Sequence, residues 1–156
     1  FPACAYRHAC SETGPGHATI GTGAPARAHG IVRNAWWSEA DNRVVYCAED
    51  AVPPLPEWPE GKLRGPGKLL VPTFASTLKA HVPGSRAVSV AWKDRSAILM
   101  GGRDADLCIW CEPTTGNFVT NTAWVAAAPE WLVAFWGCLL AGVVVGIVAL
   151  PLAMAL

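Results

Sequence analysis

The residues best suited to chemistry stand in the stretch from Ser11 to Ile20, where Thr13 directly precedes a Gly-Pro-Gly turn. A helix-compatible run then begins at His17. A hydroxyl at the entry to a helix is most often an N-cap. It also stands where free backbone N–H groups stabilise an anion such as phosphate, which suits a nucleophile. The local pattern alone favours the cap, so the case for a nucleophile depends on residues further along the chain.

Two further blocks carry polar side chains that suit anion binding. Asn34 closes the block His29-Gly30-Ile31-Val32-Arg33-Asn34, and Lys93-Asp94-Arg95 follows an apolar run. Lysine supplies a point charge, whereas arginine supplies a planar fork of donors. We expect Lys93 and Arg95 to alternate along an extended segment, with Asp94 pointing elsewhere. Taken singly, Asn34 is better interpreted as a turn residue, and Lys93 and Arg95 as the solvated end of a strand.

In this order, the three blocks resemble the alkaline phosphatase superfamily. They are most similar to its threonine-nucleophile, PafA-like phosphomonoesterase branch, which is related to the type I phosphodiesterase/nucleotide pyrophosphatases. That branch carries T-G-P-G-H-A-T, then H-G-I-V-x-N, then K-x-R, and the resemblance covers Tyr6 to Trp124. It implies an α/β fold, part of a three-layer αβα sandwich.

The resemblance also implies a role for each matching residue. Thr13 would be the nucleophile and a metal ligand, and Gly14 would contact the phosphate. Asn34 would donate its amide to a phosphoryl oxygen. Lys93 and Arg95 would contact the extra non-bridging oxygens and so favour phosphate monoesters over diesters. His17 and His29 fall within the blocks but are not family metal ligands, so they are interpreted as structural.

The resembled family uses two zinc ions held by several Asp and His residues. Of that ligand set only Thr13 matches, because the chain begins at Phe1 and ends before the downstream ligands. The chain is therefore expected to be a fragment of a zinc-dependent phosphatase that is inactive alone. The resemblance also implies a location in the periplasm or cell envelope, with or without attachment to the membrane.

Composition narrows the alternatives. The net charge is zero and no basic run occurs, which excludes the electrostatic footprint of a nucleic-acid-binding protein. The chain has six cysteines. Cys108 and Cys111 form the one C-x-x-C pair, and residues three apart in a strand point to opposite faces. We therefore expect ordinary buried or partly buried cysteines rather than a metal site.

The pattern predicts alternating strands and helices. We expect a helix over 16–23 and a hairpin of Trp36-Trp37 with Val44–Cys47 across the turn Asp41-Asn42. Residues 49–68 are rich in Pro and Gly and are expected to be irregular. The remaining expected elements are a helix from Pro72 with Phe74, Leu78 and Val82 on one face, a doubly buried central strand Ala87–Trp92, a helical turn Ala97–Met100, and hairpin strands Leu107–Cys111 and Asn117–Thr120.

The last 26 residues differ from the rest. No charged residue occurs from Trp131 to Leu156, which is long enough for a membrane helix. The segment 139–155 resembles the first membrane helix of SulP anion transporters, so a SulP-type or membrane-anchored piece without catalysis is the alternative. The expected organisation is an α/β part over 1–124, a linker over 125–130 and an apolar helix over 131–156 that contacts the membrane.

Overall fold

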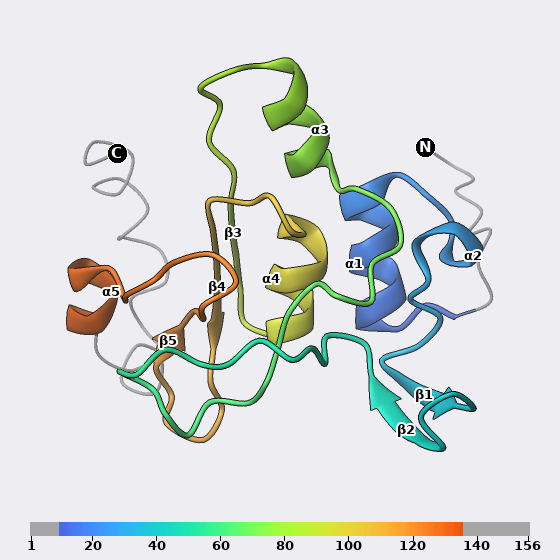
Figure 1. Ribbon diagram of the computed structural model, residues 1–156, viewed down its shortest axis with the longest axis horizontal. Coiled ribbons are helices and arrows are strands. Elements are labelled where there is room, and N and C mark those ends of the chain that lie inside the picture. Colours follow the sequence, from blue (N-terminus) through green and yellow to red (C-terminus); the bar gives the residue numbers. More distant parts are fainter. Residues whose placement is uncertain (1–9, 136–156) are drawn as a thin grey trace, which may run out of the picture.

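The computed structural model describes residues 10–135. They form a mixed α/β fold with two small sheets (Figure 1). In chain order the elements are α1 (Thr13–Thr22), α2 (Ala26–His29), β1 (Ala35–Ser38), β2 (Arg43–Tyr46), α3 (Phe74–His81), β3 (Val88–Ala91), α4 (Asp94–Gly101), β4 (Leu107–Cys111), β5 (Phe118–Val119) and α5 (Glu130–Ala134).

The larger sheet has the strand order β3-β4-β5, with β3 and β4 parallel and β5 antiparallel to β4. The predicted strand β3 therefore exists, but it is the edge strand, and the prediction of a central, doubly buried strand was wrong. Val88 and Val90 are 48% and 59% exposed. The small residues Ser89 and Ala91 alternate with them and are less exposed. The central strand is β4, whose five residues are all buried.

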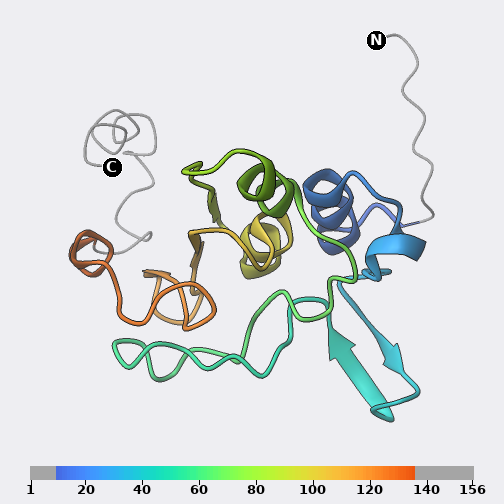
Figure 2. The same cartoon turned by 45° about the horizontal axis from the view of Figure 1, so that its top comes forward.

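Helix α4 connects β3 to β4, lies against the sheet and separates it from α1 (Figures 1 and 2). Ala97 and Ile98 pack against Cys108 and Trp110 of β4. On its other side α4 meets α1 so closely that a Cβ on Gly21 would lie 2.7 Å from the carbonyl oxygen of Leu99. The ends of α1 and α4 are thus adjacent, and the two helices run in the same direction.

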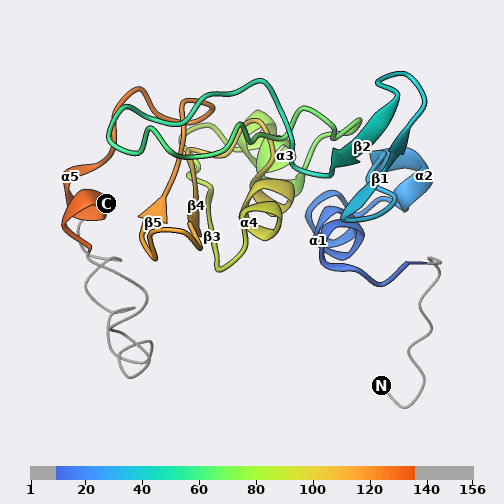
Figure 3. The same ribbon diagram turned by 90° about the horizontal axis from the view of Figure 1, so that it is seen from below.

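The β1–β2 hairpin forms as predicted, with Trp36 opposite Val45. Its turn contains Asn42, which has a positive φ of 50°. Asparagine tolerates that left-handed conformation better than most residues. The hairpin projects from the body of the fold beside the start of α1 (Figure 3).

The Pro-rich segment 49–68 contains no helix or named strand, as predicted. It extends from the hairpin along the sheet toward α5 and returns (Figure 3). Isolated bridges join Glu49 to Arg64 and Pro54 to Asn121. The side-chain amide of Asn121 donates to the carbonyl of Arg64 over 2.6 Å. These contacts hold Arg64 in a fixed position without regular structure around it.

Helix α3 differs from its prediction in which face is buried. It begins at Phe74, after Thr73 at the N-cap position, and its buried residue is Ala75. Phe74 is 70% exposed and Val82 is 50% exposed. The prediction of a helix from the spacing was correct. The predicted apolar face is nevertheless exposed to solvent, because the side of the helix that carries Ala75 packs inward.

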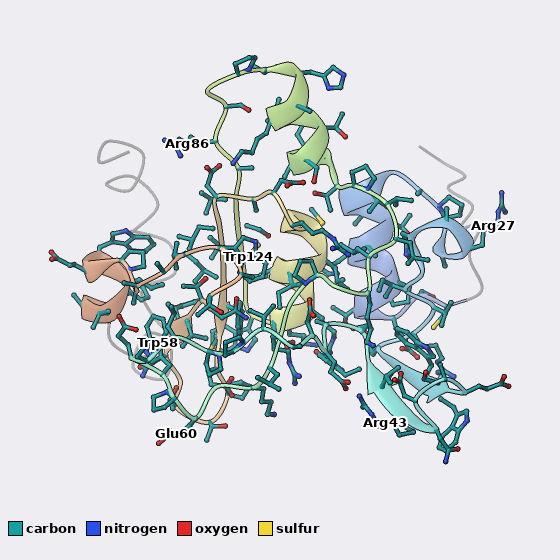
Figure 4. All side chains as sticks on the ribbon, viewed as in Figure 1. Arg27, Arg43, Trp58, Glu60, Arg86 and Trp124 are labelled. Atoms are coloured by element: carbon teal, nitrogen blue, oxygen red, sulfur yellow. The ribbon has the colours of Figure 1, made fainter. Side chains whose placement is uncertain are left out.

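At the C-terminal side, Trp124 donates from its indole N–H to the carbonyl of Gly102 over 3.0 Å and packs beside α4 (Figure 4). Further on, Leu132 of α5 is buried against Leu107 and Ile109. Packing of described residues therefore continues past residue 124, and the predicted division at that residue stays a prediction.

Most of the predicted membrane helix over 131–156 lies outside the described residues, including the whole SulP-like segment 139–155. Within residues 10–135, no helix has both the length and the apolar character needed to cross a membrane. Helix α5 (Glu130–Ala134) overlaps the start of the predicted helix and has five residues.

Candidate functional site

Thr13 is the first residue of α1, and Glu12 occupies the N-cap position. The hydroxyl of Thr13 makes no hydrogen bond within residues 10–135, so the N-cap interpretation of Thr13 was wrong. The Gly-Pro-Gly sequence does not form a turn before the helix but is its first turn. Proline is tolerated there because the first N–H groups of a helix have no intrahelical partner.

Asn34 lies directly beside the start of α1. The backbone N–H of Gly14 donates to Oδ1 of Asn34 over 2.7 Å. Because Oδ1 accepts this bond, the Nδ2 group of the same amide points away from Gly14 with its two donors. A Cβ on Gly14 would lie 2.9 Å from Sγ of Cys47, so this approach requires glycine. The phosphate-binding role of Gly14 stays a prediction, since its N–H has a protein partner.

Glu12 holds Asn34 from the other side. Its carboxylate accepts from the backbone N–H of Asn34 over 2.6 Å and pairs with Arg33 over 2.6 Å. The bond from Asn34, followed by that from Arg33, lowers the pKa of Glu12 to about 2. The carboxylate is therefore ionised at neutral pH and fixes the backbone of Asn34 next to Gly14.

A second group surrounds the start of α4, where Lys93 is at the N-cap position and Asp94 begins the helix. Nη1 of Arg95 donates to the hydroxyl of Tyr46 over 2.9 Å. That hydroxyl donates to Asp94 over 2.6 Å. The other carboxylate oxygen of Asp94 accepts from Nε of Arg64 over 2.7 Å. The expectation that Lys93 to Arg95 form one extended segment was therefore wrong, because Arg95 is already helical.

These side chains surround a cavity of about 360 Å³. Lys93, Arg95, Arg64 and Lys62 contribute four positive charges to its lining, and Asp94 and Glu112 contribute two negative charges. The net charge of the lining favours an anion. The amine of Lys93 has no hydrogen-bond partner within the described residues, so it is available to a ligand. Thr13 and Asn34 do not line this cavity.

The two groups meet at the end of β2. Tyr46 reaches the start of α4, while its neighbour Cys47 contacts Gly14 at the start of α1. Because α1 and α4 run in the same direction, both helix N-termini lie at the end next to the hairpin (Figure 1). Two positive helix ends are thereby placed near each other, which further favours an anion.

Both histidines that were interpreted as structural make hydrogen bonds within the fold. Nδ1 of His17 lies 2.8 Å from the carbonyl oxygen of Thr13. His29 is buried; its Nδ1 accepts from the backbone N–H of Ile31 over 3.1 Å, and its Nε2 lies 3.1 Å from the hydroxyl of Thr19. Since Nδ1 accepts, Nε2 carries the proton and donates to Thr19.

Cys47 and Cys108 are free, buried thiols, and Cys111 is buried as well. Burial raises the pKa of Cys47 to about 12 and also raises the pKa of Cys108. Burial therefore disfavours the thiolate form of both residues at neutral pH. Residues 10–135 contain no group of three or more His, Cys, Asp or Glu arranged to hold a metal ion. This donor set does not fit zinc by itself.

Sequence reasoning missed four residues of the site: Glu12, Tyr46, Arg64 and Asp94. Asp94 stands inside the K-x-R block, but its side chain was expected to point away from the site. Glu12 directly precedes the candidate nucleophile Thr13, and this position in the sequence could have identified it as a residue of the site. Tyr46 and Arg64 stand 48 and 30 residues from Asp94. No local pattern connects residues at such separations.

Comparison with known proteins decides the family. Residues 5–131 match the model of the family described as type I phosphodiesterase / nucleotide pyrophosphatase. The chain belongs to this family. Within it, the chain is an alkaline phosphatase superfamily segment of the PafA-like kind, as the sequence blocks indicated. The matched range ends before the segment 139–155, so the SulP resemblance gains no support.

The chain is 42% identical to alkaline phosphatase PhoK from a Sphingomonas species over 113 residues, which cover 70% of this chain and 20% of that protein. It also resembles the crystal structure of alkaline phosphatase PafA, with 32% identity and a TM-score of 0.73, covering 78% of this chain and 24% of that one. A variant of PafA substituted at a threonine, an asparagine, a lysine and an arginine gives 30% identity and a TM-score of 0.72, with the same coverage. The chain thus spans about a fifth to a quarter of these relatives.

Proposed function

We propose that this chain is the phosphoryl-binding part of a metal-dependent phosphatase that hydrolyses phosphate monoesters, with Thr13 as the nucleophile. One observation carries the proposal. Asn34 and Arg95 are each anchored by a hydrogen bond to the protein, to Gly14 and Tyr46, at the adjacent N-termini of α1 and α4. Anchored donors beside two positive helix ends need no reorganisation when an anion arrives.

Each residue then has a distinct role. The hydroxyl of Thr13 makes no hydrogen bond within the described residues, so it is available as the nucleophile. It loses its proton and attacks phosphorus while the bond from phosphorus to the leaving alcohol breaks, and water then cleaves the Thr13–phosphate ester to release inorganic phosphate. Nδ2 of Asn34 donates to one non-bridging oxygen. Lys93 and Arg95 balance the charge on the others, as phosphoryl transfer requires. A monoester carries one more negative oxygen than a diester, so this pair favours monoesters.

The substituted PafA variant supports these assignments. Its substituted threonine and asparagine are separated by the same number of residues as Thr13 and Asn34. Its lysine and arginine are two apart, like Lys93 and Arg95. The four positions thus recur in the relative with the same residue types and spacing within each pair, which favours a shared role.

Threonine is a weak nucleophile at its ordinary pKa and needs a metal ion or a base to become an alkoxide. We propose zinc as the metal, on the resemblance. Since the described donors do not fit zinc by themselves, the 156-residue chain is expected to bind phosphate without hydrolysing esters. We further propose a periplasmic or secreted location, which is common among alkaline phosphatases.

The test has two arms on the purified 156-residue chain. In the first, inorganic phosphate is titrated and followed by NMR; saturable binding that Arg95→Ala and Asn34→Ala weaken is expected, and absence of binding contradicts the proposal. In the second, p-nitrophenyl phosphate is incubated with added zinc. No turnover above background is expected, and turnover abolished by Thr13→Ala would show that the chain holds metal ligands of its own.

A further inference from the structure

We propose that Tyr46 is a positioning residue that orients Arg95 and thereby sets the preference for dianionic phosphate over a monoanionic diester. This inference rests on the proposed function and deepens it, because it assigns the charge selectivity of the same site to a residue outside the sequence blocks. Tyr46 ends β2, whereas Lys93 and Arg95 stand at the start of α4.

The direction of the hydrogen bonds shows what Tyr46 can do. The phenol of Tyr46 has one O–H group, which donates a hydrogen bond to Oδ1 of Asp94 over 2.6 Å. Its oxygen is then an acceptor, and Nη1 of Arg95 donates to it over 2.9 Å. Burial, followed by the bond to Asp94, raises the pKa of Tyr46, so the phenol keeps its proton at neutral pH. The chain of donors runs from Arg95 through Tyr46 to Asp94.

The same geometry keeps the charge of Arg95 available. Asp94 is the next residue in the chain and would neutralise Arg95 if the two side chains paired directly. Instead, Oδ2 of Asp94 pairs with Arg64 over 2.7 Å, and Oδ1 is occupied by Tyr46 and by the backbone N–H of Arg95. The neutral hydroxyl of Tyr46 therefore stands between the Asp94 carboxylate and the Arg95 guanidinium.

Within the described residues, the hydroxyl of Tyr46 is also the one hydrogen-bond partner of the Arg95 guanidinium. Nε of Arg95 is buried and has no partner there. A planar guanidinium that is fixed by one hydrogen bond is free to rotate once that bond is lost. Without the hydroxyl, Arg95 is expected to rotate toward Asp94 and lose the orientation that suits a phosphoryl group.

The ring of Tyr46 contributes to packing, and the guanidinium of Arg95 lies 5.8 Å from its centroid. The ring packs against two core clusters, one that contains Ile98 and one that contains Leu99. The guanidinium of Arg64 lies 4.4 Å from the centroid of the ring. Tyr46→Phe retains this ring and removes only the hydroxyl. The substitution therefore removes the hydrogen bond to Arg95 while keeping the packing of the core and the contact of the ring with Arg95.

The experiment uses the full chain at about pH 8, where inorganic phosphate is a dianion. Affinities for inorganic phosphate and for diethyl phosphate, a monoanion, are measured by NMR titration. The loss of one hydrogen-bonded orientation is expected to make Tyr46→Phe bind phosphate about five- to tenfold more weakly. Affinity for diethyl phosphate is expected to change much less. Ser38→Ala, which removes a hydroxyl from β1 of the same hairpin, is the matched control and is expected to change neither affinity.

A double-mutant cycle with Arg95→Ala shows whether Tyr46 acts through Arg95. In the Arg95→Ala background, Tyr46→Phe is expected to have no further effect on phosphate affinity. An equal loss in both backgrounds overturns the inference, as does an unchanged affinity in Tyr46→Phe when Arg95→Ala binds weakly. An Arg95→Ala variant that binds phosphate like the unaltered chain refutes the proposed function instead.

A second readout is independent of any ligand. The Nε–H of Arg95 is buried, so its exchange with water is expected to be slow in the unaltered chain and faster in Tyr46→Phe. Unchanged exchange would show that the hydroxyl does not hold Arg95. Thermal unfolding of Tyr46→Phe, monitored in parallel, confirms that the core persists.

Discussion

The side-chain amide oxygen of Asn34 accepts a hydrogen bond from the backbone N–H of Gly14 over 2.7 Å. This relationship assigns the two ends of the amide different tasks. The oxygen fixes the side chain at the start of α1, and the nitrogen carries two donors that make no hydrogen bond within the described residues. Position and donation can therefore be separated by substitutions that alter one end at a time.

Asn34→Asp keeps the acceptor for Gly14 but replaces the two donors with negative charge. We expect inorganic phosphate to bind at least about tenfold more weakly, because a donor is lost and like charges repel. The melting temperature is expected to change little, since the bond to Gly14 persists. Asn42→Asp makes the same charge change in the hairpin turn and serves as control. Retained phosphate affinity in Asn34→Asp would show that Nδ2 does not contact the anion.

Glu12→Gln tests the carboxylate that holds Asn34 and Arg33. The pKa of Glu12 is lowered to about 2, so its contribution to stability is present above its ordinary pKa and is lost as pH falls toward about 2. Glu12→Gln is therefore expected to be less stable than the unaltered chain at pH 7. The difference should close between about pH 4.5 and pH 2.

Urea unfolding across that pH range measures this effect. Glu39→Gln is the control, since Glu39 is an exposed hairpin carboxylate without an ion-pair partner in the described residues. A stability difference for Glu12→Gln that stays constant down to about pH 2 would contradict the linkage. It would assign the loss to packing rather than to charge.

Gly21→Ala tests the close contact between α1 and α4. The added Cβ would meet the carbonyl oxygen of Leu99 at 2.7 Å, and backbone cannot move aside as a side chain can. We expect a loss of about 1–3 kcal/mol in unfolding free energy.

Gly16→Ala is the matched change in the same helix, where no atom lies within 4 Å of the added Cβ. It is expected to be neutral or stabilising by up to about 1 kcal/mol. Equal effects of the two substitutions would show that helix propensity, rather than the contact between α1 and α4, determines the change in unfolding free energy.

Leu132→Ala tests whether the packed part extends past residue 124. Leu132 is 2% exposed and contacts Leu107 and Ile109, so truncation should cost about 2–5 kcal/mol. Val133→Ala, at a neighbouring position that is 50% exposed, should cost less than about 0.5 kcal/mol. Chemical denaturation of both variants provides the measurement. If Leu132→Ala behaves like Val133→Ala, the predicted boundary at residue 124 gains support.

The sequence by itself determined the family, the hairpin, the irregular Pro-rich segment and the strands around Gly116. These depend on short-range signals: turn residues, proline content, alternation of apolar residues and three motif blocks in a fixed order. The blocks also named Thr13, Asn34, Lys93 and Arg95 as the candidate site. Local chemistry was sufficient there because each block is contiguous.

Tertiary structure alone decided which faces and partners these elements have. Phe74 and Val90 look like core residues by spacing, yet both are exposed, because burial depends on what packs against an element and not on its own period. Likewise, Tyr46 and Arg64 carry no local signal, and they contact Asp94 only because the hairpin and the Pro-rich segment fold back onto α4. The candidate site residues were readable from the sequence. The residues that contact them were not, since contacts across 30 or 48 positions exist only in the folded chain.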